Sequence, residues 1–268
     1  MTSDANRFNA YDSDVGIQDF WDDIGRADSV ALLLDYDGTL APFHVDRMQA
    51  FPSDGIVDAL REIRDSGRTI CALVSGRPVA EVLALLPDPG VTIIGTHGFE
   101  VRHPGEDIST TAISPQQGQL LDRALDDAQL LVGKARTERK VATVAAHFRG
   151  LDRLDARETQ QNLLERWLTY ADTSAVEVRQ FNGGLEMRAL GRHKGLAVAD
   201  FLDTCPDNVL AVYVGDDDTD EDAFKTVNER RGFAIRVGKL NETTAASGSI
   251  PTCADVPGFL QTWIKVRQ

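Results

Sequence analysis

The sequence has few of the residues that mark disulfide-rich, zinc-binding or membrane proteins. Its three cysteines, Cys71, Cys205 and Cys253, form no Cys-x-x-Cys pair and fit a reducing compartment. No apolar run is long enough to cross a membrane, and the polar start MTSDANRFNAYDSD is unlike a signal peptide. These absences predict a cytoplasmic protein without a membrane partner.

Basic residues are also scarce, because 28 Lys and Arg stand against 42 Asp and Glu, a formal net charge of −14. This balance argues against nucleic acid and anionic membranes as partners. The 268 residues, 42% of them hydrophobic, can build one large domain or two modest ones. We expect a monomer, in which a phosphorylated ligand would need a local cation site or a few placed Lys and Arg.

Short apolar runs alternate with amphipathic segments toward both ends of the chain, after a terminus of about 15 residues that we expect to be frayed. We predict strands at 31–34, 69–74, 91–94, 209–214 and 233–237. We predict helices at about 17–24, 52–66, 78–86, 194–203 and 221–229. Fully apolar strands that alternate with helices predict an α/β fold, with a parallel sheet covered by helices on both faces.

The middle of the chain has a different pattern. Long helices are predicted at about 115–132 and 153–170, and strands at 141–148, 175–180 and 185–188. The last two strands meet at Asn182-Gly183-Gly184, which is a hairpin signal. We therefore predict an α+β domain of residues 104–188, inserted into a parallel-sheet domain of residues 1–103 and 189–268.

Three polar clusters directly follow three of the predicted strands. They are Asp35-Tyr36-Asp37-Gly38-Thr39, Ser75-Gly76-Arg77 and Gly215-Asp216-Asp217. In an open parallel sheet, ligands bind beyond the carboxyl ends of the strands, so the three clusters should meet at one edge. This meeting is a stronger signal than any one of the motifs.

The first cluster suits the hydrolysis of a phosphate ester. Asp35 can attack phosphorus to form an aspartyl-phosphate, and Asp37 can protonate the leaving alcohol and then activate water. Gly38 permits a tight turn, and Thr39 offers a hydroxyl and an N–H to phosphate oxygens. The alternative is an acidic turn that caps a helix, but the buried strand and the two partner clusters favour catalysis.

Two carboxylates would repel a phosphate dianion unless a cation lies between them, and oxygen ligands of this charge suit Mg²⁺. Asp216 is the expected further ligand, with Asp217 in the same metal site and Asp220 able to orient the ligands. The alternative for residues 216–222 is an acidic first turn of a helix, and both interpretations can hold.

Two further residues can bind phosphate. Ser75 can donate a hydrogen bond to it, and Gly76 lets the backbone come close, although Ser75 alone fits a helix N-cap almost as well. Lys194 offers a compact charge that suits phosphoryl oxygens and keeps a nucleophile ionised. A lone Lys is usually a solvated surface residue, so this role depends on the resemblance that follows.

The order DxDGT, Ser-Gly-Arg, Lys-Gly and GDD resembles the haloacid dehalogenase (HAD) superfamily of phosphatases. The resemblance implies a Rossmann-like core and a type-2 cap that selects the substrate. It implies Mg²⁺ held by Asp35, the backbone carbonyl of Asp37, and Asp216, with phosphate bound by Ser75 and Lys194. Glycines near 95–105 and 191–194 would let the cap move as a lid.

The chain is more closely similar to the trehalose-6-phosphate phosphatases. The similarity lies in LLLDYDGTLAPF, VSGRP, GTHGFE, ERK with AAHFRG, LEMR, HKG and VGDDDTDEDAF. It implies hydrolysis of trehalose 6-phosphate to trehalose and phosphate. It implies sugar contacts from six residues of the cap, Glu138, Lys140, His147, Arg149, Glu186 and Arg188. His193 stands where the family has Asn, and Phe148 where Tyr is common.

Several alternatives stay open. Glu138 and Lys140 can share a strand face and bind glucose hydroxyls, or form a solvated ion pair. His97 can bind substrate or be structural, and Arg77 can contact substrate or pair with an acidic neighbour. The substrate could be a sucrose, glucosylglycerol or mannosylglycerate phosphate instead. A non-catalytic sugar-phosphate sensor is disfavoured, since neither the nucleophile nor the metal ligands are lost.

Overall fold

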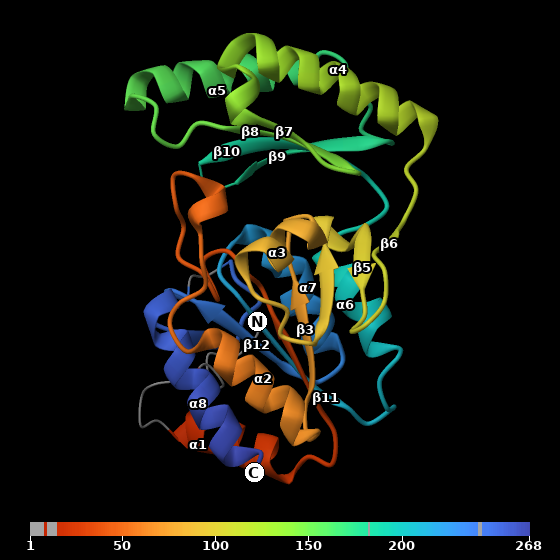
Figure 1. The fold of residues 1–268 in the computed structure, drawn as a ribbon. Coiled ribbons are helices and arrows are strands. Elements are labelled where there is room, and N and C mark those ends of the chain that lie inside the picture. The colour runs from red at the N-terminus through yellow and green to blue at the C-terminus, as the bar shows by residue number, and fades with distance from the viewer. Residues whose placement is uncertain (1–7, 10–14, 182, 241–242) are drawn as a thin grey trace. The chain divides into compact units, whose positions relative to one another are not determined.

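The computed structural model describes residues 8–9, 15–181, 183–240 and 243–268. The chain forms two compact units, one of Met1–Ile108 with His193–Gln268 and the other of Ser109–Arg192 (Figure 1). Most of the terminus that we predicted to be frayed, and Asn182 of the predicted hairpin, lie outside the described residues.

The first unit is built on a mainly parallel sheet in the order β1-β13-β12-β11-β2-β3-β4-β5. Neighbouring strands are parallel, except that β5 runs antiparallel to β4. The strands are β1 (Phe8–Asn9), β2 (Val30–Leu34), β3 (Ile70–Val74), β4 (Thr92–Gly95), β5 (Glu100–Arg102), β11 (Leu210–Gly215), β12 (Phe233–Val237) and β13 (Gly248–Ile250). The predicted α/β fold is confirmed, and β5 is the exception to its parallel sheet.

Helices cover both faces of this sheet. Leu32 and Leu34 of β2 pack with α1, α2, α3 and α8, whereas Ala31 and Leu33 pack with α6 and α7. Successive residues of a strand point to opposite faces, so a strand covered on both sides is apolar throughout. The helices are α1 (Val15–Arg26), α2 (Ile56–Ser66), α3 (Val79–Leu85), α6 (Lys194–Leu202), α7 (Glu221–Glu229) and α8 (Val256–Val266).

The second unit is an antiparallel sheet in the order β7-β8-β10-β9, with two long helices that contact it. Helix α4 begins at a capping box, because Ser114 and Gln117 each accept the other's backbone N–H. The indole N–H of Trp167 on α5 donates to the carbonyl of Ala124 on α4. The elements are β6 (Ser109–Thr110), α4 (Pro115–Val132), β7 (Thr137–Arg139), β8 (Thr143–His147), α5 (Arg153–Leu168), β9 (Val176–Phe181) and β10 (Gly184–Ala189).

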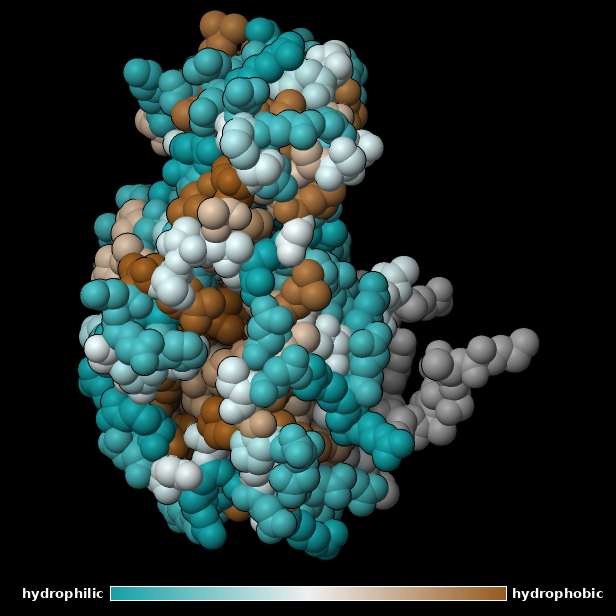
Figure 2. Space-filling view, turned by 90° about the vertical axis from the view of Figure 1, so that its right-hand side faces the viewer, coloured by the Kyte–Doolittle hydropathy of each residue, from teal (hydrophilic) through white to brown (hydrophobic). Residues whose placement is uncertain are grey.

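Short 3₁₀ turns complete the described chain, and two of them adjoin the site. They are η2 (Arg47–Gln49), η3 (Thr96–Gly98), η4 (Lys134–Arg136), η5 (Asp218–Asp220) and η6 (Cys253–Asp255). Hydrophilic residues make up most of the face that Figure 2 shows, with hydrophobic residues scattered between them. Among the described helices, none combines the length and the apolar composition needed to cross a membrane.

Candidate active site

The candidate nucleophile lies where β2 ends. The backbone N–H of Asp35 still donates to Val214 of β11 at 2.9 Å, which holds Asp35 at the junction of two central strands. The chain then turns back on itself, since the N–H of Gly38 donates to the carbonyl of Ala41 at 2.8 Å. Gly38 has a φ of +78°, which residues with a side chain rarely adopt.

The side chain of Lys194, the first residue of α6, extends to Asp35 at this junction. Its Nζ donates to Oδ1 of Asp35 and to Oδ1 of Asp220, both at 2.7 Å, and all three side chains are buried. Burial opposes the positive charge, but Asp220 and Asp35 outweigh it and raise the pKa of Lys194. Lys194 therefore remains a cation beside Asp35.

Asp220, which the sequence suggested could orient the metal ligands, accepts four hydrogen bonds. One of its oxygens accepts from the hydroxyl of Tyr213 at 2.6 Å as well as from Lys194. The other accepts the backbone N–H groups of Asp216 and Asp217 at 3.0 and 3.1 Å. With each oxygen bound by two donors, the Asp220 carboxylate fixes the loop after β11, which carries Asp216.

Carboxylate oxygens of Asp35, Asp216 and Asp220 lie within 4.8 Å of one another. Burial raises the pKa of Asp35 well above its usual range, and Asp220 and Asp216 add to the rise while Lys194 opposes it. Burial likewise raises the pKa of Asp216 to about 8, with Asp217 and Asp220 adding to it. The Asp216 carboxylate has no hydrogen bond or ion pair with any described residue, so the cluster can hold a divalent cation.

Asp217, predicted in the metal site, uses one carboxylate oxygen in the neighbouring turn. Its Oδ1 accepts from the N–H and from the hydroxyl of Thr219, both at 2.7 Å. With Asp220 it forms a capping box at the start of η5. The acidic-cap alternative therefore describes Asp217, while the cation-site interpretation fits the geometry of Asp216.

Asp37, the expected acid and base, is held by Arg77. Nε and Nη2 of Arg77 donate to the two carboxylate oxygens at 2.6 and 2.7 Å. Of the two roles open for Arg77, the structure has the pairing with an acidic neighbour. The sequence placed the two clusters at one edge but did not single out this pair, whose members lie 40 positions apart on different loops.

The remaining predicted phosphate residues surround the same edge. The Ser75 hydroxyl accepts the N–H of Arg77 at 3.1 Å and can still donate, and it caps no helix, since α3 follows Pro78. A Cβ on Gly76 would lie 2.8 Å from the His97 ring, so His97 occupies the space that glycine leaves. The Thr39 hydroxyl is buried and has no hydrogen-bond partner in the described part of the chain.

The six predicted sugar-binding residues all belong to the second unit, and four of them cluster there. Nζ of Lys140 lies 3.7 Å from Glu138 and 3.8 Å from Glu186, and Nε2 of His147 lies 3.6 Å from Glu138. Arg188 makes an ion pair with Glu177 of β9 instead.

The sixth of these residues, Arg149, lies beside the hairpin. Its Nε would be 2.8 Å from a Cβ on Gly183, and its carbonyl accepts a hydrogen bond from Arg136 at 2.8 Å. Arg188 thus has an acidic partner on β9, and it shares a face of β10 with Glu186, two residues before it.

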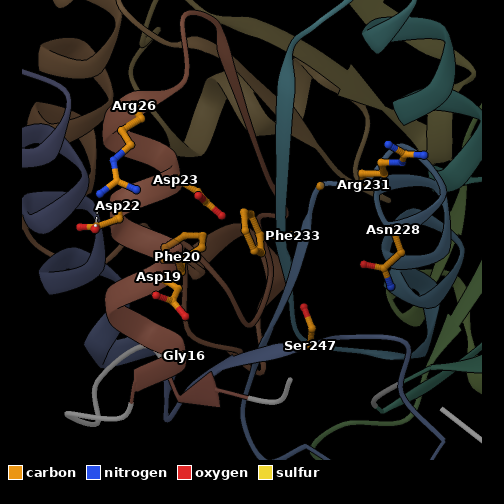
Figure 3. A pocket seen from close by; sticks show the side chains of 11 residues that line it. Gly16, Asp19, Phe20, Asp22, Asp23, Arg26, Asn228, Arg231, Phe233 and Ser247 are labelled. Carbon is orange, nitrogen blue, oxygen red and sulfur yellow. Dashed lines mark hydrogen bonds and ion pairs between the residues drawn. The ribbon is translucent and has the colours of Figure 1, made fainter. Parts of the chain in front are cut away.

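A separate depression of about 610 Å³ lies elsewhere in the first unit (Figure 3). Asp19, Asp22 and Asp23 of α1 line one side, and Asn228 and Arg231 line the other. It borders the amino-terminal ends of β12 and β13, whereas the clusters described above follow carboxyl ends of strands. None of its lining residues belongs to the predicted site.

Comparisons with known proteins give the family of the chain. The sequence profile of the family described as Trehalose-phosphatase matches residues 33–254. The probable trehalose-phosphate phosphatase C of Arabidopsis thaliana is 29% identical over 258 residues, which cover 89% of this chain and 78% of that protein. The alpha,alpha-trehalose-phosphate synthase [UDP-forming] B of Dictyostelium discoideum is 28% identical over 243 residues, which cover 89% of this chain but only 31% of that protein.

Solved structures share the fold. The C-terminal domain of a C. albicans trehalose-6-phosphate phosphatase superposes with a TM-score of 0.83 at 20% identity, covering 98% of this chain and 99% of that one. A haloacid dehalogenase-like hydrolase from Bacteroides thetaiotaomicron superposes with a TM-score of 0.63 at 15% identity, covering 87% and 98%. The fold is thus that of the HAD hydrolases, and from the profile match the chain belongs to the trehalose-phosphatase family.

Proposed function

We propose that this chain hydrolyses trehalose 6-phosphate to trehalose and phosphate, with Mg²⁺ and through an aspartyl-phosphate on Asp35. The observation that carries the proposal is the position of the buried Asp35, between the ammonium of Lys194 and the carboxylate of Asp216. The family membership supports the substrate. The proposal also takes the protein to be monomeric and, with its three free cysteines, cytoplasmic.

In the first half-reaction, a carboxylate oxygen of Asp35 attacks phosphorus while the bond from phosphorus to the sugar oxygen breaks. The carboxyl group of Asp37 gives its proton to that leaving oxygen. In the second half-reaction, water attacks phosphorus and loses a proton to Asp37, and the bond to Asp35 breaks. Lys194 favours the ionised form of Asp35 at the start and its departure at the end.

The donors at this edge fit a hard divalent cation. When bound, Mg²⁺ supplies charge neutralisation between the carboxylates and the phosphate dianion. Asp35 and Asp216 would hold it together with the backbone carbonyl of Asp37, as the HAD resemblance implies. Asp220 is occupied on both oxygens and fixes the loop that carries Asp216. Ser75 and Thr39 keep hydroxyl groups for the phosphate oxygens.

We propose further that the second unit is the cap that selects the sugar. Its cluster of Glu138, Lys140, His147 and Glu186 offers acceptors beside donors, which is what a ring of hydroxyl groups needs. Asp35, Asp37 and Lys194 then act on any phosphate ester, and the cluster decides which sugar is bound well.

The test is phosphate release from a panel of sugar phosphates, with Mg²⁺ and with EDTA. We expect the highest kcat/KM on trehalose 6-phosphate, lower values on sucrose and glucosylglycerol phosphates, and no turnover without a divalent cation. Full activity in protein shown by elemental analysis to be free of metal would contradict the cation's role. A clear preference for another phosphate would replace the substrate and leave the chemistry in place.

A further inference from the structure

The fork between Arg77 and Asp37 is held on the arginine side by burial and by an aromatic ring. The Arg77 side chain is 8% exposed, and its guanidinium carbon lies 5.5 Å from the ring centre of Tyr36. Both oxygens of Asp37 accept from it, at 2.6 and 2.7 Å. A two-bond fork fixes the plane of a carboxylate as well as its position.

The series of charges continues away from the site. Nη1 of Arg77 lies 3.8 Å from Oε2 of Glu81, which is on the first turn of α3. Glu81 accepts two hydrogen bonds of 2.7 Å from Arg47 of η2. Charges therefore alternate in sign along Arg47, Glu81, Arg77 and Asp37, and they connect the loop after β2, the segment at η2 and the start of α3.

Ordinary surface ion pairs contribute little to stability, but this series differs from them in geometry and burial. Two of its three links are bidentate, and the side chains of Arg47 and Glu81 are only 32% and 19% exposed. The last residue of the series, Asp37, is the proposed proton carrier. The middle link is electrostatic, since Nη1 of Arg77 is buried and has no hydrogen-bond partner in the described chain, and the carboxylate of Glu81 is 3.8 Å away. Loss of the charge on Glu81 would remove the attraction on this end of the guanidinium, and Asp37 would be affected through the fork.

We propose that Glu81 and Arg47 are positioning residues, which hold Arg77 so that it keeps the Asp37 carboxyl group in place for proton transfer. The inference rests on the proposed function, in which Asp37 moves the proton. With both oxygens in the fork, Asp37 is the carboxylate that accepts a proton from water. To protonate the sugar oxygen, one oxygen leaves the fork with its proton while the other stays on Arg77.

The test compares two substrates with different leaving groups. The sugar alkoxide needs a proton to leave, whereas the nitrophenolate of p-nitrophenyl phosphate does not. Because kcat/KM covers the steps up to release of the alcohol, it isolates the half-reaction in which Asp37 gives its proton. We expect Glu81→Gln to lower kcat/KM about tenfold on trehalose 6-phosphate and less than about twofold on p-nitrophenyl phosphate.

The loss should be in kcat, with KM for trehalose 6-phosphate unchanged within about twofold, because no substrate contact is removed. Arg47→Met should lower kcat/KM for the sugar phosphate about fivefold by itself, and no more than about twofold when Glu81→Gln is already present. Once one link of the series has been removed, removing a second link should have little further effect. Losses that add fully would mean that the two residues act independently, and would overturn the inference.

The matched control is Asp203→Asn, which removes the 2.6 Å ion pair with Arg230 in the same unit but outside the series. It should leave both rates unchanged. Arg77→Ala adds a readout that a purely structural role would not give, since free guanidinium ion should restore part of the sugar-phosphate rate. Thermal unfolding would reveal whether Glu81→Gln is folded. If it is not, the guanidinium rescue and the Arg47→Met variant test the inference in its place.

Equal losses on the two substrates, or no loss on either, would overturn the inference. The wild-type rate on trehalose 6-phosphate tests the proposed function separately. If the wild type is active and the variants have unchanged rates, the result counts against the positioning roles of Glu81 and Arg47 alone. If the wild type prefers another sugar phosphate, the same comparison is made with that substrate.

Discussion

A Cβ atom on Gly38 would lie 2.2 Å from Oδ2 of Asp216, closer than side chains approach one another in real proteins. The turn after β2 and the carboxylate after β11 thus occupy adjacent space that only glycine leaves open. Gly38 is also in the left-handed region, with a φ of +78°. Asp216 can therefore occupy its position only because residue 38, 178 positions earlier, is a glycine.

We predict that Gly38→Ala lowers phosphate release at least about 100-fold, because Asp216 must move away from its place beside Asp35. The backbone strain alone costs roughly 1–2 kcal/mol of unfolding free energy. Gly55→Ala is the matched control, since Gly55 has a φ of +83° and nothing within 4 Å of its Cβ position. Denaturant unfolding should show a similar strain in both variants, and equal activities would contradict the contact with Asp216.

A second prediction concerns pH and the metal. Since the pKa of Asp216 is raised to about 8 in the folded protein from an ordinary 3.8, the metal-free fold prefers this carboxyl protonated. Its contribution to stability is therefore present near pH 4, falls as the pH rises, and is lost above about 8. Mg²⁺ should raise the Tm of the wild type more at pH 8 than at pH 5.

Asp216→Asn isolates this effect, because an amide does not ionise. In EDTA at pH 8 the variant should melt several degrees above the wild type, since about 1 kcal/mol shifts Tm by roughly 2–4 °C in a chain of this size. The gain should be smaller at pH 5 and disappear only below about pH 4, and Mg²⁺ should no longer stabilise the variant. A variant that melts below the wild type at pH 8 without metal would contradict the electrostatic account.

A third prediction separates the sugar cluster from the phosphate site. Glu138→Ala or Glu186→Ala should cut kcat/KM for trehalose 6-phosphate by about 100-fold or more, because a sugar hydroxyl loses its acceptor. Turnover of p-nitrophenyl phosphate should scarcely change. Glu165→Gln, an exposed change on α5 of the same unit, controls for general effects. Equal losses on both substrates would assign these residues to the fold or to the chemistry.

Much of the fold and the catalytic edge could be predicted because buried parallel strands leave a plain mark in the sequence. Each strand is a short, fully apolar run, and the polar residues that follow it must lie at the carboxyl edge. The places of Asp35, Ser75 and Asp216 at this edge follow from that rule alone. The turn at Gly183 before β10 and the end of α2 at Gly67 follow from backbone conformations that glycine favours.

The roles of the acidic residues after β11 could not be read in the same way. Asp216, Asp217 and Asp220 have the same chemistry, and only the 3₁₀ turn at 218–220 decides which of them caps and which faces Asp35. The pairing of Arg77 with Asp37 joins two loops, so no local pattern carries it. Strand β5 is three residues long, which is too short to show a period.

The most direct test of the account is to find where the phosphoryl group goes. Wild-type protein mixed with labelled trehalose 6-phosphate and Mg²⁺, quenched in acid within a turnover and mapped by peptide mass, should carry the phosphoryl group on Asp35. The folded Asp35→Asn variant should carry none and release no phosphate. Label on a different residue, or near-normal turnover by Asp35→Asn, would contradict the assignment of Asp35 as the nucleophile.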